Sequence, residues 1–225
     1  MNLAASSGRR QIVTAALLCA LLSLRWYLRS RSVPFEYLLA STHTIPVSYC
    51  AIAPGHPLHG PYHDQEYGFP IEDEASLFER LILEINQAGL SWLTILAKRA
   101  NFRAAYHDFD VDRVARYGTR ERDRLLGDPG IIRNRLKIDA AIANAKKIQQ
   151  LRESDGGFAQ WLATHHPLTK PEWVKLFKKT FSFTGGEITG EFLMSIGYLP
   201  GTHVETCPVY TTIARLKPPW MNADR

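Results

Sequence analysis

The stretch DEASLFERLILEINQA, residues 73–88, sets the class of the fold. Apolar side chains recur along it at spacings of three and four, at Leu77, Phe78, Leu81, Ile82 and Ile85. An α-helix repeats every 3.6 residues, so these side chains share one face and predict an amphipathic helix. Similar patterns continue along the chain, and we find no alternating stretch long enough for a useful strand. The sequence therefore predicts an all-α protein.

Further helices are expected on the C-terminal side of this stretch. The pattern resumes after Gly89, and the predicted helical segments are residues 90–96, 101–109, 111–117, 120–126, a long helix through 138–148, 158–162, 171–181 and 187–196. Thr119 is a typical N-cap, Pro171 a typical first residue of a helix and Gly197 a typical stop. About eight short helices are predicted in all, without an internal repeat.

Composition excludes several classes of protein. With 225 residues, 45% hydrophobic and 22% charged, the chain is neither disordered nor collagen-like, and three cysteines do not make a disulfide framework. A reducing compartment is the default expectation. The net charge is +5, but residues 1–45 carry most of it, with five arginines and one glutamate. Bulk charge therefore does not indicate DNA binding by residues 46–225.

Residues 1–45 differ in character from the rest of the chain. Arginines flank an apolar run at residues 12–24, which is shorter than the roughly 20 residues that a membrane-spanning helix needs. Three interpretations stay open: an organellar transit peptide, a signal or anchor segment, and upstream sequence translated from a start site placed too early. We expect a leader at residues 1–45 and one folded domain at residues 46–225.

Four possible zinc ligands lie near the two ends of the expected domain. Cys50 and His63 lie near its start, and His203 and Cys207, four residues apart, lie near its end. Zinc binds thiolate and imidazole tetrahedrally, and two cysteines with two histidines form a complete structural site. Such a site would join both ends across a long loop, where a cross-link constrains the unfolded chain most. On spacing alone, buried thiols and ordinary polar histidines remain the alternative.

Glu84 falls on the apolar side of the helix predicted at residues 73–88. A buried carboxylate is costly unless it is paired or hydrogen-bonded. The position is therefore either a helix edge that reaches water or an arginine, or an acceptor within a cavity. Tyr62, Tyr67 and Trp92 are candidates for the walls of such a cavity. One acceptor with two or three aromatic faces suits a flat, nitrogen-rich ligand such as a nucleobase.

A tight turn joins two predicted helices at LGDPGII, residues 126–132, and Arg133, Arg135 and Lys137 follow it. Backbone N–H groups at a helix N-terminus favour phosphate, and three nearby cations would add a salt-dependent attraction. A helix–turn–helix joint with a solvated basic face explains the same residues equally well.

Three strings of residues together resemble the DNA-3-methyladenine glycosylase I family. They are YHDQEYG at residues 62–68, QAGLSW at residues 87–92 and GIIRNR at residues 130–135, within a match that covers residues 49–210. The resemblance implies an all-α, helix-hairpin-helix glycosylase fold. It also implies one structural Zn²⁺ in a zinc snap that joins the N- and C-terminal ends of the domain, with Cys50, His63, His203 and Cys207 as ligands.

The resemblance also implies roles for the site residues. Glu84 is the expected catalytic residue, which hydrogen-bonds the edge of a base flipped out of the duplex. Tyr62 and Trp92 are expected to stack on that base, with Tyr67 as a further base-binding residue. The residues implied to contact DNA are Gly89, Leu90, Gly130, Arg133, Arg135 and Lys137.

The implied activity is hydrolysis of the N-glycosidic bond of 3-methyladenine in alkylated double-stranded DNA, which leaves an abasic site and free 3-methyladenine. Asn134 lies about where strand-cutting relatives carry a lysine, so we expect a monofunctional enzyme. The resemblance favours a monomer without an obligate protein partner in the bacterial cytoplasm, with organellar targeting by residues 1–45 as the alternative. The competing function is a zinc-stabilised protein that binds damaged DNA without hydrolysing it.

The sequence departs from the family pattern at several positions. Ile52 and His59 replace residues that are often aromatic, and Tyr67 stands for a tryptophan. Leu136 replaces a glycine found in the hairpin of some members. We therefore expect a less aromatic base pocket and leave the lesion range open.

Overall fold

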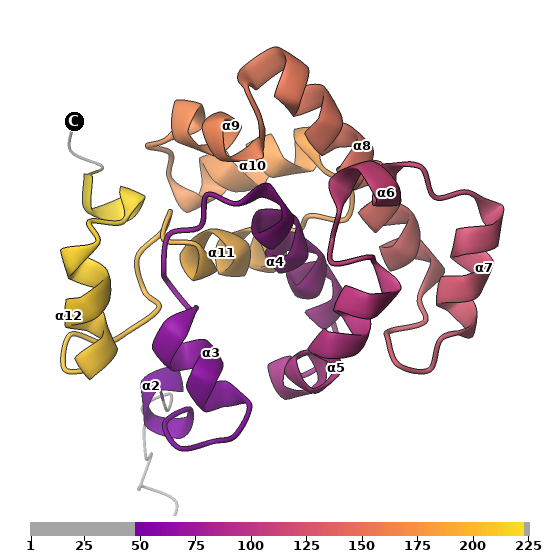
Figure 1. The fold of residues 1–225 in the computed structure, drawn as a ribbon. Coiled ribbons are helices and arrows are strands. Elements are labelled where there is room, and N and C mark those ends of the chain that lie inside the picture. Colours follow the sequence, from indigo (N-terminus) through magenta and orange to yellow (C-terminus); the bar gives the residue numbers. More distant parts are fainter. Residues whose placement is uncertain (1–47, 223–225) are drawn as a thin grey trace, which may run out of the picture. The chain divides into compact units, whose positions relative to one another are not determined.

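The computed structural model describes residues 48–222, and this part of the chain is helical without any strand, as predicted. Its α-helices are α2 (Tyr49–Ile52), α3 (His59–Gln65), α4 (Glu74–Gln87), α5 (Trp92–Ala105), α6 (Val111–Ala115), α7 (Thr119–Gly127), α8 (Arg135–Asp155), α9 (Phe158–His165), α10 (Lys170–Thr180), α11 (Gly186–Ser195) and α12 (Pro208–Arg215). A short 3₁₀ helix, η2 (Pro219–Asn222), follows α12 (Figure 1).

Helix α4 is the central element of the fold, surrounded by α5, α6, α8, α9 and α11 (Figure 1). It begins after Asp73, whose carboxylate accepts the Ser76 N–H at 2.8 Å and so caps the first turn. The apolar side chains predicted to share one face are all buried in the core. The predicted amphipathic helix is therefore confirmed, and its C-terminal end carries Glu84.

Two local predictions differ from the structure. Residues 90–96 and 101–109 do not form separate helices, because α5 runs unbroken through Trp92–Ala105. It ends where His107, Asp108 and Phe109 all adopt positive φ, between 52° and 59°, which an α-helix cannot accommodate. The N-cap of α7 is Gly118 rather than Thr119, and its N–H donates to the Glu121 carboxylate at 2.8 Å.

The predicted helix punctuation near the C-terminal side is confirmed. Pro171 lies in the first turn of α10, and Gly197 follows α11 with φ +79°. The expected leader at residues 1–45 lies outside the described residues, so the division at residue 45 stays a prediction. Among the described residues, no helix combines the length and apolarity needed to cross a bilayer.

Candidate functional site

A cavity of about 250 Å³ opens where five helices and a loop meet. Its lining residues come from α2, α3, the segment after α3, the C-terminal end of α4, the start of α5 and α11: Tyr49, Tyr62, Tyr67, Glu84, Gln87, Trp92 and Glu191. The cavity therefore brings Glu84 together with all three aromatic residues predicted to bind a base. It adds Tyr49 and Glu191, which the sequence analysis does not identify.

Glu84 is buried at the wall of this cavity, with 4% of its surface exposed. Burial raises the pKa of its carboxyl to about 8, against an opposing effect of Arg80 and a further rise from Glu191. Among the described residues, no side chain or backbone group hydrogen-bonds this carboxyl. Its oxygens are thus available to a ligand, and of the two readings of Glu84 the cavity acceptor fits the geometry.

The aromatic rings form adjoining walls rather than a parallel pair. The Tyr62 and Trp92 ring centroids are 5.0 Å apart at an interplanar angle of 59°. A base sandwiched between two parallel rings would need them about 7 Å apart, twice the usual contact distance. A base in this cavity can therefore lie flat against one of these rings and meet the other at its edge.

Arg80 packs behind Tyr62 and is nearly inaccessible to solvent. It donates to Tyr62 Oη at 2.6 Å and to Glu66 Oε2 at 3.0 Å, and its Cζ lies 4.7 Å from the Tyr62 ring centroid. Arg99 of α5 binds the same Glu66 carboxylate through two hydrogen bonds, at 2.6 and 2.8 Å. This chain of ion pairs fixes the Tyr62 wall. One signal for Arg80 was available, because it precedes Glu84 by four residues and shares its helix face.

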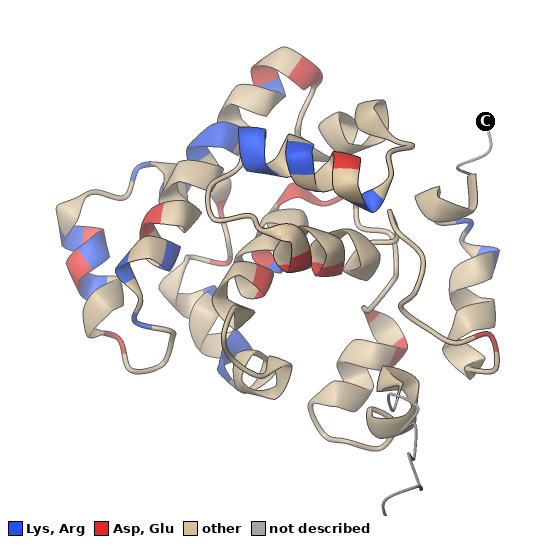
Figure 2. Cartoon of the chain, turned by 180° about the vertical axis from the view of Figure 1, so that it is seen from behind, with Lys and Arg blue, Asp and Glu red and all other residues tan. Residues whose placement is uncertain are grey.

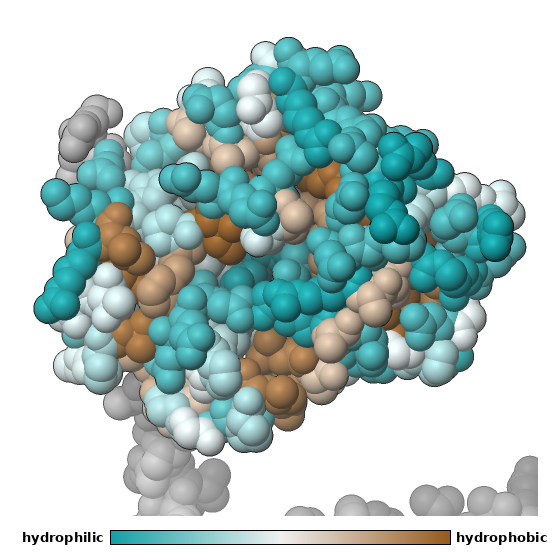
Figure 3. Space-filling view, in the orientation of Figure 1, coloured by the Kyte–Doolittle hydropathy of each residue, from teal (hydrophilic) through white to brown (hydrophobic). Residues whose placement is uncertain are grey.

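The turn between α4 and α5 holds the next two predicted residues beside the cavity. Gly89 adopts φ +81°, a conformation that glycine takes without strain, and no atom approaches the position of its missing Cβ. Leu90 and Leu93 are 42% and 39% exposed, and the surface over α5 shows a hydrophobic patch (Figure 3). The turn and the start of α5 therefore leave apolar surface open to solvent beside the cavity.

The hairpin between α7 and α8 is tied to α5. Lys98 Nζ donates to the carbonyls of Pro129 and Gly130, at 2.9 and 3.2 Å. A Cβ at Gly130 would lie 2.9 Å from the Asp128 carboxylate and 3.1 Å from Asn101, so a side chain there would require these two neighbours to shift. Since α5 begins at Trp92 in the cavity wall, one helix connects the cavity to the hairpin.

The three basic side chains that follow the hairpin differ in their exposure to solvent. Arg133 and Arg135 are exposed, as a DNA contact requires. Lys137 is different, because only 5% of its surface is exposed and its Nζ donates to the carbonyls of Asn86 and Ala88, at 2.9 and 2.7 Å. It binds the C-terminal carbonyls of α4, so the structure argues against the predicted DNA contact and gives Lys137 a structural role.

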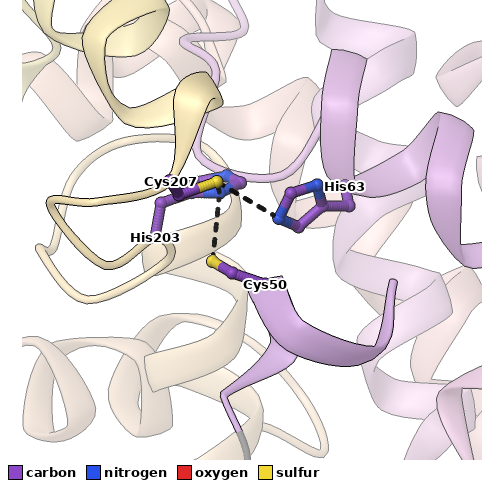
Figure 4. A group of neighbouring side chains, drawn as sticks. All are labelled: Cys50, His63, His203 and Cys207. Carbon is purple, nitrogen blue, oxygen red and sulfur yellow. Dashed lines mark hydrogen bonds between the residues drawn. The ribbon is translucent and has the colours of Figure 1, made fainter. Parts of the chain in front are cut away.

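The four candidate metal ligands come together in one cluster (Figure 4), although Cys50 and Cys207 are far apart in the chain. Their potential ligand atoms all lie within 4.8 Å of one another. The His203 Nδ1 atom is 3.6 Å from the sulfur of Cys50 and also from that of Cys207, and Cys207 Sγ is 3.7 Å from His63 Nε2. In a tetrahedral zinc site a sulfur and a nitrogen ligand are about 3.6 Å apart, so these donors fit zinc.

The outer ring nitrogens of both histidines have partners. His63 Nδ1 lies 2.6 Å from Asp64 Oδ1, and His203 Nε2 lies 2.7 Å from the backbone oxygen of Tyr67. Such partners fix the tautomer and leave the inner nitrogen free to bind a metal. The second contact also connects the cluster to the cavity, because the ring of Tyr67 forms part of the cavity wall.

Comparison with known proteins assigns the chain to a family. The chain belongs to the methyladenine glycosylase family, whose family model matches residues 52–173.

Two curated relatives and a solved structure show the extent of the similarity. The chain is 37% identical over 173 residues to DNA-3-methyladenine glycosylase 1 of Escherichia coli (strain K12), covering 68% of this chain and 92% of the relative. It is 34% identical over 170 residues to DNA-3-methyladenine glycosylase of Haemophilus influenzae, covering 67% and 91%. It also resembles a crystal structure of a variant of 3-methyladenine DNA glycosylase I in complex with 3-methyladenine, with TM-score 0.67 and 29% identity, over 72% of this chain and 96% of the other.

Proposed function

We propose that this chain hydrolyses the N-glycosidic bond of 3-methyladenine in alkylated double-stranded DNA and leaves an abasic site. The observation that carries the proposal is the Glu84 carboxyl, buried without a partner among the described residues at the wall of a cavity with aromatic sides. The family membership and the relatives named for this activity support it.

The cavity suits the chemistry of this lesion. 3-Methyladenine in DNA carries a positive charge, which weakens its glycosidic bond and makes the base a good leaving group. Each contact between the cation and an aromatic ring contributes about 0.5–2 kcal/mol. Burial favours the protonated form of Glu84 in the empty cavity, whereas a positively charged base favours the carboxylate, which can then accept from the exocyclic amine.

We further propose that the hairpin and the turn before α5 form the DNA-binding face. Gly130, Arg133 and Arg135 would contact the phosphate backbone, and Gly89 and Leu90 would lie beside the gap left by the flipped base. Among the described residues, the backbone N–H groups of Ile132 and Arg133 have no hydrogen-bond partner, which supports a phosphate contact. Overall charge does not single out this face, because lysines also form a row along α10 (Figure 2).

The reaction is proposed to be monofunctional. Asn134, at the expected position of a catalytic lysine, has a side chain that cannot form a Schiff base and instead accepts the Lys137 N–H at 3.2 Å as the cap of α8. We propose that the enzyme acts as a monomer, without an obligate protein partner, in the bacterial cytoplasm; the two named relatives come from bacteria.

We also propose that one structural Zn²⁺ is held by Cys50 Sγ, Cys207 Sγ, His63 Nε2 and His203 Nδ1. Four protein ligands leave no open position for a reacting water, so the metal would stabilise the fold rather than take part in hydrolysis. This assignment is supported by the separations of the donor atoms and by the partners of the outer ring nitrogens.

The proposed activity is tested by incubating the full chain with duplex DNA methylated by dimethyl sulfate and identifying the released bases by chromatography. We expect release of 3-methyladenine with intact strands, which break only after alkaline treatment of the abasic sites. Binding to methylated DNA without release above the buffer rate would instead support the protein that binds damage without hydrolysing it.

A further inference from the structure

Glu191 is a second acid in the same cavity, and neither the sequence pattern nor the family resemblance predicts a role for it. It comes from α11, more than 100 residues after Glu84, and both side chains line the cavity of about 250 Å³. Tyr67 Oη donates to Glu191 Oε2 at 3.2 Å, so the carboxylate is anchored at the cavity wall on the side of the Tyr67 ring. One of its two oxygens remains for a ligand.

The charges around the two acids are unbalanced. No lysine or arginine belongs to the described residues that line the cavity. Arg80, the buried cation that lowers the pKa of Glu84, already binds Tyr62 Oη and the Glu66 carboxylate. Lys170 lies outside the cavity, 3.7 Å from the exposed Glu187 carboxylate. Two acids therefore share a small volume without a positive side chain of their own.

We propose that Glu191 is a specificity-determining residue that acts with Glu84 to select positively charged bases over neutral ones. The inference rests on the proposed function, because the charged base is the alkylated purine assigned to this cavity. A cationic base can replace the proton that the empty cavity favours on the two acids and balance both carboxylates, whereas a neutral base of the same shape cannot. Selection against neutral bases matters because undamaged adenine is far more abundant in DNA than its methylated form.

The titration behaviour of the pair is consistent with this assignment. Burial raises the pKa of the Glu191 carboxyl, against the opposing effects of the Tyr67 hydrogen bond and Lys170. Glu191 in turn contributes to the raised pKa of Glu84, with burial as the main cause and Arg80 opposing it. The empty cavity thus favours a proton on the pair. When a cationic base binds, it replaces this proton, which is released to solvent.

The experiment measures binding of two matched ligands to the full chain by titration calorimetry at about pH 8. The cation is 3,9-dimethyladeninium, and the neutral isostere is 3-deaza-3,9-dimethyladenine. We expect the wild-type protein to prefer the cation, and Glu191→Gln to reduce the ratio of the two affinities about tenfold through weaker binding of the cation. Glutamine still accepts from Tyr67, so the hydrogen bond is conserved while the charge is removed. Glu187→Gln, on the same helix with an 89% exposed side chain, is the matched control and should keep the wild-type ratio.

The outcomes separate this inference from the proposed function. An unchanged ratio in Glu191→Gln, with cation binding that Glu84→Gln abolishes, would overturn the role of Glu191 and leave the proposed function standing. Equal losses of both ligands in Glu191→Gln would also overturn it, because Glu191 would then only shape the cavity. A wild-type protein that binds neither ligand would count against the proposed function itself.

Discussion

At the scale of one residue, the buried carboxyl of Glu84 serves the site but lowers the stability of the folded protein. The unfolded chain exposes this carboxyl to water, with a pKa near 4.5, whereas burial raises the pKa to about 8 in the folded protein. The folded state therefore keeps a proton that the unfolded state releases between these values. The contribution of Glu84 to the stability of the ligand-free protein therefore falls as pH rises through this window, by at most about 1.4 kcal/mol per pH unit.

Substituting Glu84→Gln is predicted to change activity and stability in opposite directions. Excision of 3-methyladenine should fall about 100-fold or more, because the neutral amide cannot stabilise a cationic base as a carboxylate does. The free energy of unfolding should exceed that of the wild-type protein at pH 8, with the difference disappearing towards pH 4.5. Denaturant titrations at several pH values and a base-release assay measure the two effects.

Glu153→Gln is the matched control for this prediction, because Glu153 is an exposed acid on α8. It should leave both the activity and the pH dependence of stability unchanged. Undiminished excision by Glu84→Gln would remove Glu84 from the site. A pH profile of stability identical to that of the wild-type protein would show that its carboxyl does not titrate in the window given above.

At the scale of elements, α8 serves two purposes within its first turn. Arg133 and Arg135 precede or begin the helix with exposed side chains, whereas Lys137 turns inward and holds the C-terminal carbonyls of α4. One helix start therefore carries both the proposed DNA contact and the support for the end of α4, three residues after Glu84. Burial lowers the pKa of Lys137, and no acidic group is among the causes.

Variants of Arg133 and Lys137 should separate DNA binding from the support of α4. Arg133→Ala is expected to weaken binding to duplex DNA and to reduce the slope of log affinity against log salt by about one, with normal stability. Lys137→Met should lower the free energy of unfolding by about 1.5–3 kcal/mol, because two buried carbonyls lose a charged donor, and leave the salt slope unchanged. Filter binding across a salt series measures the slope, and chemical denaturation measures the free energy of unfolding. The reverse pattern, a reduced slope in Lys137→Met, would return Lys137 to the DNA face.

At the scale of the whole molecule, the Cys/His cluster joins α2 and α3 to the segment before α12 (Figure 4). His63 directly follows Tyr62, and His203 contacts the backbone oxygen of Tyr67. Two of the cavity walls are thus adjacent to proposed zinc ligands. Loss of the metal would loosen the cavity as well as the junction of the two ends.

Metal removal is therefore predicted to affect both stability and activity. Elemental analysis of the purified protein should give about one zinc per chain, as expected for four protein ligands. Cys207→Ser should lose the metal, unfold with a free energy lower by about 2–4 kcal/mol, as for other cross-links, and excise 3-methyladenine more slowly. Glu205→Gln is the matched control, since Glu205 is exposed and lies between His203 and Cys207 without being one of the four ligands, and it should behave as the wild-type protein. A chain that folds with full stability in the absence of zinc would contradict the assignment.

Much of this protein could be predicted from the sequence, because the decisive features are local. The 3.6-residue repeat identified α4 and placed Glu84 on its buried face, and Pro171 and Gly197 marked the start of α10 and the end of α11. Helix formation depends on hydrogen bonds between residues four apart, so neighbouring residues carry most of that information. Lys137 could have been placed correctly in the same way, because it shares a face with the buried Ala141.

The tertiary structure alone decided which distant residues meet. Tyr49, Glu84 and Glu191 lie on three helices whose contact depends on how α2, α4 and α11 pack, and no periodicity within any one helix encodes that contact. The same holds for the angle between Tyr62 and Trp92, which packing and the buried Arg80 determine together. The sequence thus determined the helices and the acid, whereas packing between helices determined the shape and charge of the cavity, because those depend on contacts between segments far apart in the chain.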